Sequence, residues 1–283
     1  VIGVDVGGTF TDILSLDEIS GEVHVEKVPS TKGDQSSGFL SGIMAATNHD
    51  LSSVSTIIHG TTVATNALLE RKGAKAGIIT TEGFRDVLEM RRRDRPTTWG
   101  LWGQFTPVIE RKCRLEVPER TLADGTVVKK IDAASIEAAA KDLINQGCES
   151  VCLFFINGYA NKNNETKAAK ILRQIWPNDY VSVATEILPE IREFERCSTA
   201  SLNAYLQPVV ANYLARLEDR ILKENSDSEI LIVQSNGGIM SVDAAKAFPV
   251  RTALSGPAAG VVAARQIANA AGFLNVITCD MGG

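Results

Sequence analysis

The chain has 283 residues, of which 44% are apolar and 22% charged, and its net charge at pH 7 is −5. The apolar content is sufficient for a packed core and excludes a disordered or collagen-like chain. The mild acidity lacks the positive field that attracts nucleic acid or anionic lipid, and no apolar run approaches the roughly 18–20 residues that a membrane helix needs.

The first 90 residues predict short strands alternating with helices. Strands are expected where apolar residues form a short run or alternate with polar ones, and helices where apolar residues recur on one face. In chain order, the expected elements are strands at 1–4, 11–16 and 22–28, a helix over 34–49, a strand at 56–59, a helix over 62–72, a strand at 76–80 and a short helix over 82–90.

Residues 91–110 carry arginines, tryptophans and prolines without a period, which predicts a long ordered loop. Regular alternation then resumes, and Pro208 is expected to start or to kink a long helix. The elements expected here are a hairpin turn at 124–125, helices over 133–146, 164–176 and 198–223, strands at 150–156, 180–184, 230–234 and 275–280, and a helix that a glycine loop at 255–260 opens and that ends near Gly272. This alternation indicates an α/β fold with a mostly parallel sheet.

The two ends of the chain repeat one pattern, since residues 1–8 read VIGVDVGG and residues 276–283 read VITCDMGG. In each copy an apolar strand leads to an aspartate, one apolar residue and two glycines. The strand fixes Asp5 or Asp280 at its tip, and the glycines let the backbone approach a polyphosphate with N–H donors. An aspartate beside phosphate can hold Mg²⁺ or orient an attacking group.

Two such loops can clamp a nucleotide between similar lobes. We therefore predict Asp5 and Asp280 as catalytic and metal-binding residues, with Asp280 as a candidate base for water. The residues predicted to contact phosphate in the two loops are Gly7, Gly8, Thr9, Thr11, Asp12, Gly282 and Gly283. Other interpretations stay open, because Asp5 can cap a tight turn, Thr11 can face its strand, and Asp12 can serve a turn or a salt bridge.

His59, Thr61 and Thr62 lie between an expected strand and the start of an expected helix. A helix N-terminus offers free N–H groups and a partial positive charge, so we predict that Thr61 and Thr62 lie near nucleotide or substrate. His59 is a catalytic candidate. The alternatives are that a threonine caps the helix and that His59 is a hydrogen-bonded core residue.

The five cysteines form no CxxC pair, and the chain has three histidines and no HExxH motif. This usage favours free thiols in the reducing cytoplasm. It argues against a metal-hydrolase centre of the usual kind within these residues.

VGGTFTD at residues 6–12 resembles the first phosphate loop of the actin-like ATPase superfamily. More narrowly, the chain resembles the ATP-binding subunit of the hydantoinase/oxoprolinase family, of the hydantoinase A type. The segments that carry this resemblance are GVDVGGTFTD (3–12), HGTTVATNALLERKGAKAGIITTEGFRDVLEM (59–90), ILPEIREFER (187–196) with NAYLQPVV (203–210), and SNGGIMS, RTALSGPAAG and CDMGG within 235–283.

The resemblance implies an actin-like (ribonuclease H-like) ATPase lobe, with a mixed sheet flanked by helices. It implies an N-terminal family domain over 1–177 and the start of a hydantoinase A domain over 178–283, so that the chain is a fragment ending where the second lobe starts. ATP and Mg²⁺ are the implied cofactors. The implied partner is a second, hydantoinase-type (B) subunit or region, and homo-oligomerisation stays open.

The implied reaction is the ATP-dependent ring opening of a cyclic amide, such as 5-oxoproline in glutathione metabolism or a hydantoin. Three alternatives remain: a subunit of an ATP-dependent ketone carboxylase, a non-enzymatic actin-like nucleotide switch, and a small-molecule kinase. Stimulation of phosphate release by a lactam distinguishes the cyclic-amide hydrolase from the nucleotide switch, because a switch would not respond to the lactam.

Overall fold

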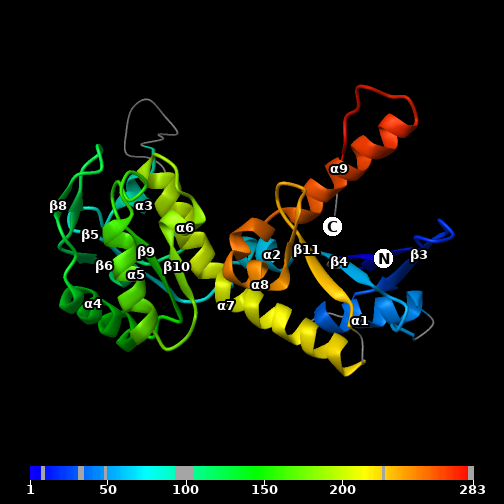
Figure 1. The fold of residues 1–283 in the computed structure, drawn as a ribbon, viewed down its shortest axis with the longest axis horizontal. Coiled ribbons are helices and arrows are strands. Elements are labelled where there is room, and N and C mark those ends of the chain that lie inside the picture. Colours follow the sequence, from blue (N-terminus) through cyan, green and yellow to red (C-terminus); the bar gives the residue numbers. More distant parts are fainter. Residues whose placement is uncertain (8–9, 31–34, 48–49, 93–104, 225–226, 280–283) are drawn as a thin grey trace. The chain divides into compact units, whose positions relative to one another are not determined.

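The computed structural model describes residues 1–7, 10–30, 35–47, 50–92, 105–224 and 227–279. The chain divides into two compact units (Figure 1). Unit 1 combines Val1–Lys72 with Val209–Gly283, and unit 2 is Gly73–Pro208. The predicted family regions, 1–177 and 178–283, divide the chain by sequence and not by compact unit. They stay a prediction.

Unit 1 is built on a six-stranded mixed sheet. In hydrogen-bonded order, its strands are β12 (Ile239–Ser241), β11 (Glu229–Val233), β4 (Thr56–Thr61), β1 (Ile2–Val6), β2 (Phe10–Leu16) and β3 (Val23–Pro29). β11, β4 and β1 run parallel, whereas β12, β2 and β3 are antiparallel to their neighbours. The carboxyl ends of the three parallel strands therefore meet at one edge, which is where ligands bind in open α/β sheets.

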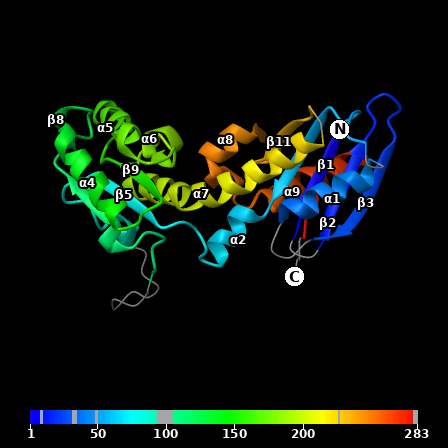
Figure 2. The same ribbon diagram turned by 90° about the horizontal axis from the view of Figure 1, so that it is seen from below.

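Helix α1 (Gln35–Ala46) covers one face of β1, β2 and β3 (Figure 2). Ile13 on β2 and Phe39 and Ile43 on α1 are buried in this layer. Successive strand residues point to opposite faces, so Asp5 and Asp12 lie on the face away from α1. The other helices of unit 1 are α2 (Val63–Leu69), the last part of α7 (Glu193–Lys223), α8 (Val242–Ala247), the short 3₁₀ helix η2 (Pro249–Thr252) and α9 (Ser255–Ala270).

Unit 2 has an entirely parallel sheet in the order β10 (Val181–Val183), β9 (Ser150–Phe154), β5 (Ala76–Thr81) and β6 (Arg114–Val117). β5 and β9 are buried along their whole length, which is typical of a parallel sheet covered on both faces. A hairpin of β7 (Arg120–Thr121) and β8 (Val127–Lys129) is attached. The helices of this unit are α3 (Val87–Met90), η1 (Arg111–Cys113), α4 (Ala133–Asn145), α5 (Asn163–Ile175), α6 (Ala184–Ile187) and the first part of α7.

Helix α7 contains Pro208, and a serine from the sheet compensates for the missing donor. Proline has no backbone N–H, so the carbonyl of Ala204, four residues earlier, cannot receive its usual helical hydrogen bond. The Ser150 hydroxyl donates to this carbonyl instead, at 2.6 Å, and Ser150 is fully buried. Pro208 thus lies inside a continuous helix, and the prediction that it starts the helix is wrong.

Most of the other expected elements are confirmed, including the helices α4 and α5, the buried strand β9 and the turn at Gly125, whose φ is 86°. The mixed α/β fold with helices flanking the sheets is also confirmed (Figure 1). All five cysteines are free thiols. Among the described residues, no helix combines the length and the apolar character that crossing a bilayer requires.

Two local predictions are wrong. Residues 275–279 form no strand, since no described strand pairs with them and Ile277 is 99% exposed. Residues 255–260 form no loop, because α9 already begins at Ser255 and includes both glycines of this segment. Pro257 is tolerated there because its missing N–H falls in the first turn, where N–H groups have no helical partner.

Candidate functional site

Asp5 presents an exposed carboxylate near the carboxyl end of β1, between the buried residues Val4 and Val6. Across the sheet it pairs in register with Gly60 of the parallel strand β4 and with Asp12 of the antiparallel strand β2. Strand alternation therefore places Asp5 on the open face of the sheet, at the edge where the parallel strands end.

Gly60 leaves room for the Asp5 side chain. A Cβ atom at residue 60 would lie 3.2 Å from Asp5 Oδ1 and 3.8 Å from Asp5 Cγ. Any other residue would press on the carboxylate, so glycine at this position fits the conformation that Asp5 adopts. Gly60 belongs to the segment 59–62, which the sequence predicts to lie near nucleotide or substrate, but nothing in the local sequence shows which residue of β4 faces Asp5.

Gly7 makes the tight turn between β1 and β2. Its N–H donates to the carbonyl of Phe10 at 3.0 Å, and a Cβ atom at Gly7 would lie 2.9 Å from the same oxygen. This close approach requires glycine. The predicted phosphate contacts Gly8 and Thr9 lie outside the described residues.

Thr11 and Asp12 are engaged within the protein. Thr11 is fully buried, and its hydroxyl lies 3.0 Å from that of Ser30, which donates to the carbonyl of Gly7 at 2.8 Å. Asp12 is exposed and forms an ion pair with Lys27 at 2.7 Å. Thr11 and Ser30 together support the turn at Gly7, whereas phosphate binding by Thr11 and Asp12 stays a prediction. Ser30 was not identified from the sequence.

Thr61 and Thr62 hold the junction between β4 and α2. Thr61 Oγ1 accepts a hydrogen bond from the N–H of Val63 at 3.2 Å. Thr62 Oγ1 donates to the carbonyl of Val6 at 3.3 Å and accepts from Asn66 Nδ2 at 3.3 Å. The junction is therefore tied to the end of β1, next to Asp5. A nucleotide contact by either threonine stays a prediction.

The start of α9 is fixed to the same junction. The buried Ser255 hydroxyl donates to the carbonyl of Thr61 at 3.3 Å, and the N–H of Leu254 donates to Thr65 Oγ1 at 2.9 Å. Leu254 itself adopts the left-handed conformation, with φ 62°. Segments far apart in the sequence thus meet at the edge that carries Asp5.

His59 lies in the core of unit 1 and is fully buried. Its Nε2 is 2.8 Å from the Tyr213 hydroxyl, and its Nδ1 is 3.3 Å from the carbonyl of Val4. The ring packs against Phe39 with 4.8 Å between centroids. Burial lowers the pKa of His59 to about 4, so the ring is neutral at pH 7. This environment is typical of a structural histidine, and a catalytic function for His59 stays a prediction.

The described residues contain no group of three or more His, Cys, Asp or Glu side chains placed to hold a metal ion. Asp280, Gly282 and Gly283, predicted for the second loop, lie outside the described residues. Mg²⁺ is commonly held by one or two carboxylates together with water and substrate phosphates. The exposed Asp5 carboxylate, with Gly60 beside it on β4 and Asp12 opposite it on β2, fits that mode of binding.

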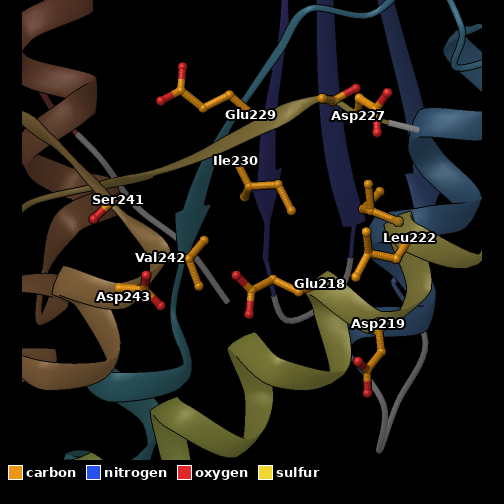
Figure 3. Close-up of a pocket in the computed structure, with 11 residues that line it drawn as sticks. Glu218, Asp219, Leu222, Asp227, Glu229, Ile230, Ser241, Val242 and Asp243 are labelled. Carbon is orange, nitrogen blue, oxygen red and sulfur yellow. The ribbon is translucent and has the colours of Figure 1, made fainter. Parts of the chain in front are cut away.

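A separate cavity of about 590 Å³ lies in unit 1 between α7, β11 and the start of α8 (Figure 3). None of the predicted site residues lines it. Its acidic lining residues are Glu218, Asp219, Asp227, Glu229 and Asp243. Glu218 forms an ion pair with Lys246. The negative lining is unfavourable for a polyphosphate, so this cavity is a poor candidate for a nucleotide site.

The chain is similar to enzymes that act on lactams and ketones. Caprolactamase subunit alpha of Pseudomonas jessenii is 32% identical over 100% of this chain and 42% of its own length. The crystal structure of ATP-dependent caprolactamase from Pseudomonas jessenii superimposes with a TM-score of 0.86, at 32% identity, over 100% of this chain and 42% of that chain. Acetophenone carboxylase gamma subunit of Aromatoleum aromaticum is 31% identical, over 100% of this chain and 41% of its length.

5-Oxoprolinase of Dictyostelium discoideum is 29% identical, over 92% of this chain and 23% of its own length. The chain thus spans less than half of these relatives. Residues 1–176 match the family described as hydantoinase/oxoprolinase N-terminal region, and residues 196–283 match the family described as hydantoinase/oxoprolinase. Together with the fold, these matches show that the chain belongs to the hydantoinase/oxoprolinase family.

Proposed function

We propose that this chain is the ATP-binding part of an enzyme that hydrolyses a cyclic amide, with 5-oxoproline or a hydantoin as the substrate. The observation that carries the proposal is the position of Asp5, exposed beside Gly60 at the carboxyl edge of three parallel strands. Relatives named for lactam hydrolysis support the substrate class. Relatives described as subunits support a second, hydantoinase-type subunit as the partner.

In the proposed reaction the amide oxygen of the lactam attacks the γ-phosphorus of ATP, and ADP leaves. Water then adds to the activated carbon, and the C–N bond breaks as the nitrogen takes up a proton, which leaves an acyl phosphate. A second water attacks the acyl carbon, and phosphate departs with the former amide oxygen. A bound Mg²⁺ would neutralise charge on the phosphates. Asp5 would hold that ion directly or through water, and Gly60 would keep the carboxylate in place.

An ATP-dependent ketone carboxylase is the second candidate function. It is favoured by the 31% identity to the gamma subunit of acetophenone carboxylase, which covers the whole of this chain. Both reactions use ATP, so both would require ATP to bind at the edge of the sheet that carries Asp5. The two proposals differ in the organic substrate, so only an assay with substrates of both classes separates them.

The test is phosphate release from Mg-ATP by the natural protein that contains this chain, together with the proposed hydantoinase-type subunit. Each of 5-oxoproline, hydantoin and caprolactam is added alone, and acetophenone with bicarbonate is the competing substrate. Asp5→Asn removes the carboxylate charge with little change in shape. Glu26→Gln makes the same chemical change at an exposed position of β3 outside the site.

We expect one lactam to stimulate phosphate release, with a loss of about a hundredfold or more in Asp5→Asn and little change in Glu26→Gln. Stimulation by the ketone alone would replace the proposed substrate class with the carboxylase. ATP binding without stimulation by any substrate would favour a nucleotide switch. Equal activity of Asp5→Asn and the unchanged protein would remove the proposed function of Asp5.

A further inference from the structure

Unit 2 contains a cavity of about 340 Å³ that no part of the proposed reaction uses. It lies between the loop that follows β9 and the first residues of α7. Its lining residues are Asn157, Tyr159, Ile191, Arg192, Glu193 and Arg196. Ligand pockets for small molecules begin at about 300 Å³, so this space suits a compact ligand.

Arg196 is the feature that indicates a ligand. Its side chain is only 1% exposed, yet it lines the cavity. Its Nη1 donates to the carbonyl of Phe155 at 3.0 Å, whereas its Nε–H has no hydrogen-bond acceptor among the described residues. Buried polar groups in native proteins nearly always have a partner, so an arginine donor without an acceptor beside a cavity points to an absent acceptor.

The ion pair between Glu165 and Arg196 leaves part of the guanidinium's hydrogen-bonding capacity available. Both of its carboxylate oxygens accept from backbone N–H groups, of Phe155 at 2.9 Å and of Thr185 at 3.0 Å. The distances from Arg196 Nη2 to the two Glu165 oxygens are longer, 3.4 and 3.5 Å. The pair is therefore loose, and the guanidinium keeps donor capacity for a second anionic group.

The other walls suit a small acid with an apolar body. Arg192 is exposed at the N-terminal end of α7, where the helix dipole also favours negative charge. The Tyr159 ring lies 6.0 Å from the Arg196 guanidinium and, with Ile191, provides an apolar surface. Glu193 is the one acidic lining residue and is itself exposed, so solvent screens its charge.

We propose that this cavity binds a small organic carboxylate, whose carboxylate accepts hydrogen bonds from Arg196 and Arg192 and whose apolar body packs against Tyr159 and Ile191. Arginine is well suited to this recognition because its planar donors match a carboxylate. The binding claim stands without the proposed function, which contributes only the choice of 5-oxoproline as a probe.

The experiment is calorimetric titration of the natural protein without nucleotide. The probes are 5-oxoproline, 2-pyrrolidinone, which is the same ring without the carboxylate, and acetate, which is a carboxylate without the ring. Arg192→Gln removes an exposed charge from the cavity. Arg173→Gln is the matched control, since Arg173 is also an exposed arginine of unit 2 and does not line the cavity. Arg196→Lys keeps the charge and removes the planar donor set.

We expect 5-oxoproline to bind, with 2-pyrrolidinone and Arg192→Gln each weaker by about tenfold or more and Arg173→Gln unchanged. Arg196→Lys should abolish binding. If that variant does not fold, as judged by circular dichroism, Arg192→Gln decides the result. The proposal is wrong if neither carboxylate binds, if 2-pyrrolidinone binds equally well, or if 5-oxoproline binds Arg192→Gln with unchanged affinity. None of these results depends on ATP hydrolysis, so they leave the proposed function to its own test.

Discussion

Asp5 and Gly60 face each other on neighbouring parallel strands, and a Cβ atom at residue 60 would come within 3.2 Å of Asp5 Oδ1. The Asp5 carboxylate therefore depends on a position 55 residues later in the chain for the space it occupies. This relationship connects the fold of unit 1 to its chemistry, because the register of β1 and β4 decides which residue of β4 lies beside the carboxylate.

Gly60→Ala tests this relationship. The added methyl group is expected to displace the Asp5 carboxylate and to lower substrate-stimulated phosphate release by about tenfold or more, since small misplacements of a functional group are costly. Gly3→Ala is the matched control, because Gly3 lies on β1 itself and a Cβ atom there meets only the carbonyl of Leu14 at 3.9 Å. Phosphate release and thermal unfolding are measured for both variants.

The two substitutions should differ in activity more than in stability. If Gly60→Ala keeps full activity while remaining folded, the space beside Asp5 has no function in positioning it. If both variants lose activity equally, the loss is a general effect of alanine in β1 and β4.

Ser150 and Pro208 allow a test of packing in unit 2. Ser150→Ala removes the hydroxyl that donates to the carbonyl of Ala204, and leaves this buried acceptor unpaired. The free energy of unfolding should fall by about 1–3 kcal/mol. Urea denaturation of the single variant measures this loss.

Pro208→Ala supplies the matching background, because alanine restores the N–H that proline lacks. In that background Ser150→Ala should cost about 1 kcal/mol less, since the carbonyl of Ala204 gains a helical donor. An equal cost in both backgrounds would mean that the serine acts through packing and not by replacing the missing donor.

Thr65→Val tests how the start of α9 is attached. The substitution keeps the shape of the side chain and removes the acceptor for the N–H of Leu254. Amide hydrogen exchange at Leu254 should become about fivefold to tenfold faster, because this hydrogen bond is worth roughly 1 kcal/mol. Thr65→Ser keeps the hydroxyl and should exchange at nearly the original rate. Unchanged exchange in Thr65→Val would show that other contacts hold α9 in place.

The sequence predicts a strand best where both faces of its sheet are buried. β9 is recognisable as an apolar run because helices cover both faces of its parallel sheet. The start of α9 cannot be recognised from the sequence, because its glycines favour a loop. Its first residues are held by Thr65 and Thr61, which are distant in the sequence. Local propensity is weaker than such tertiary contacts.

The residues of the candidate site also differ in how far the sequence predicts them. Asp5 and Gly7 are predictable, since one strand and one tight turn define both of them. Gly60 and Ser30 are not, because their importance arises only when β1 pairs with β4 and when Ser30 meets the turn at Gly7. His59 is ambiguous in the sequence, and only its burial and its two partners favour a structural function.

His59 predicts a specific dependence of stability on pH. Burial lowers its pKa from 6.5 to about 4 in the folded chain. Below pH 6.5 the unfolded chain therefore binds a proton that the folded chain does not. The contribution of the neutral His59 to the free energy of unfolding is fully present above this pH and is lost as the pH falls towards 4. Between pH 7.5 and pH 5 this one histidine should lower the free energy of unfolding by about 2 kcal/mol.

His59→Gln cannot titrate, so its unfolding free energy should lose about 2 kcal/mol less than that of the unchanged protein over the same pH interval. Urea denaturation at pH 7.5 and pH 5 measures both differences, and the carboxylates common to the two proteins cancel in the comparison. His24→Gln is the control at a histidine whose side chain is 63% exposed. If His59→Gln shows the same pH dependence as the unchanged protein, His59 is not held neutral by burial, and the case for its catalytic function becomes stronger.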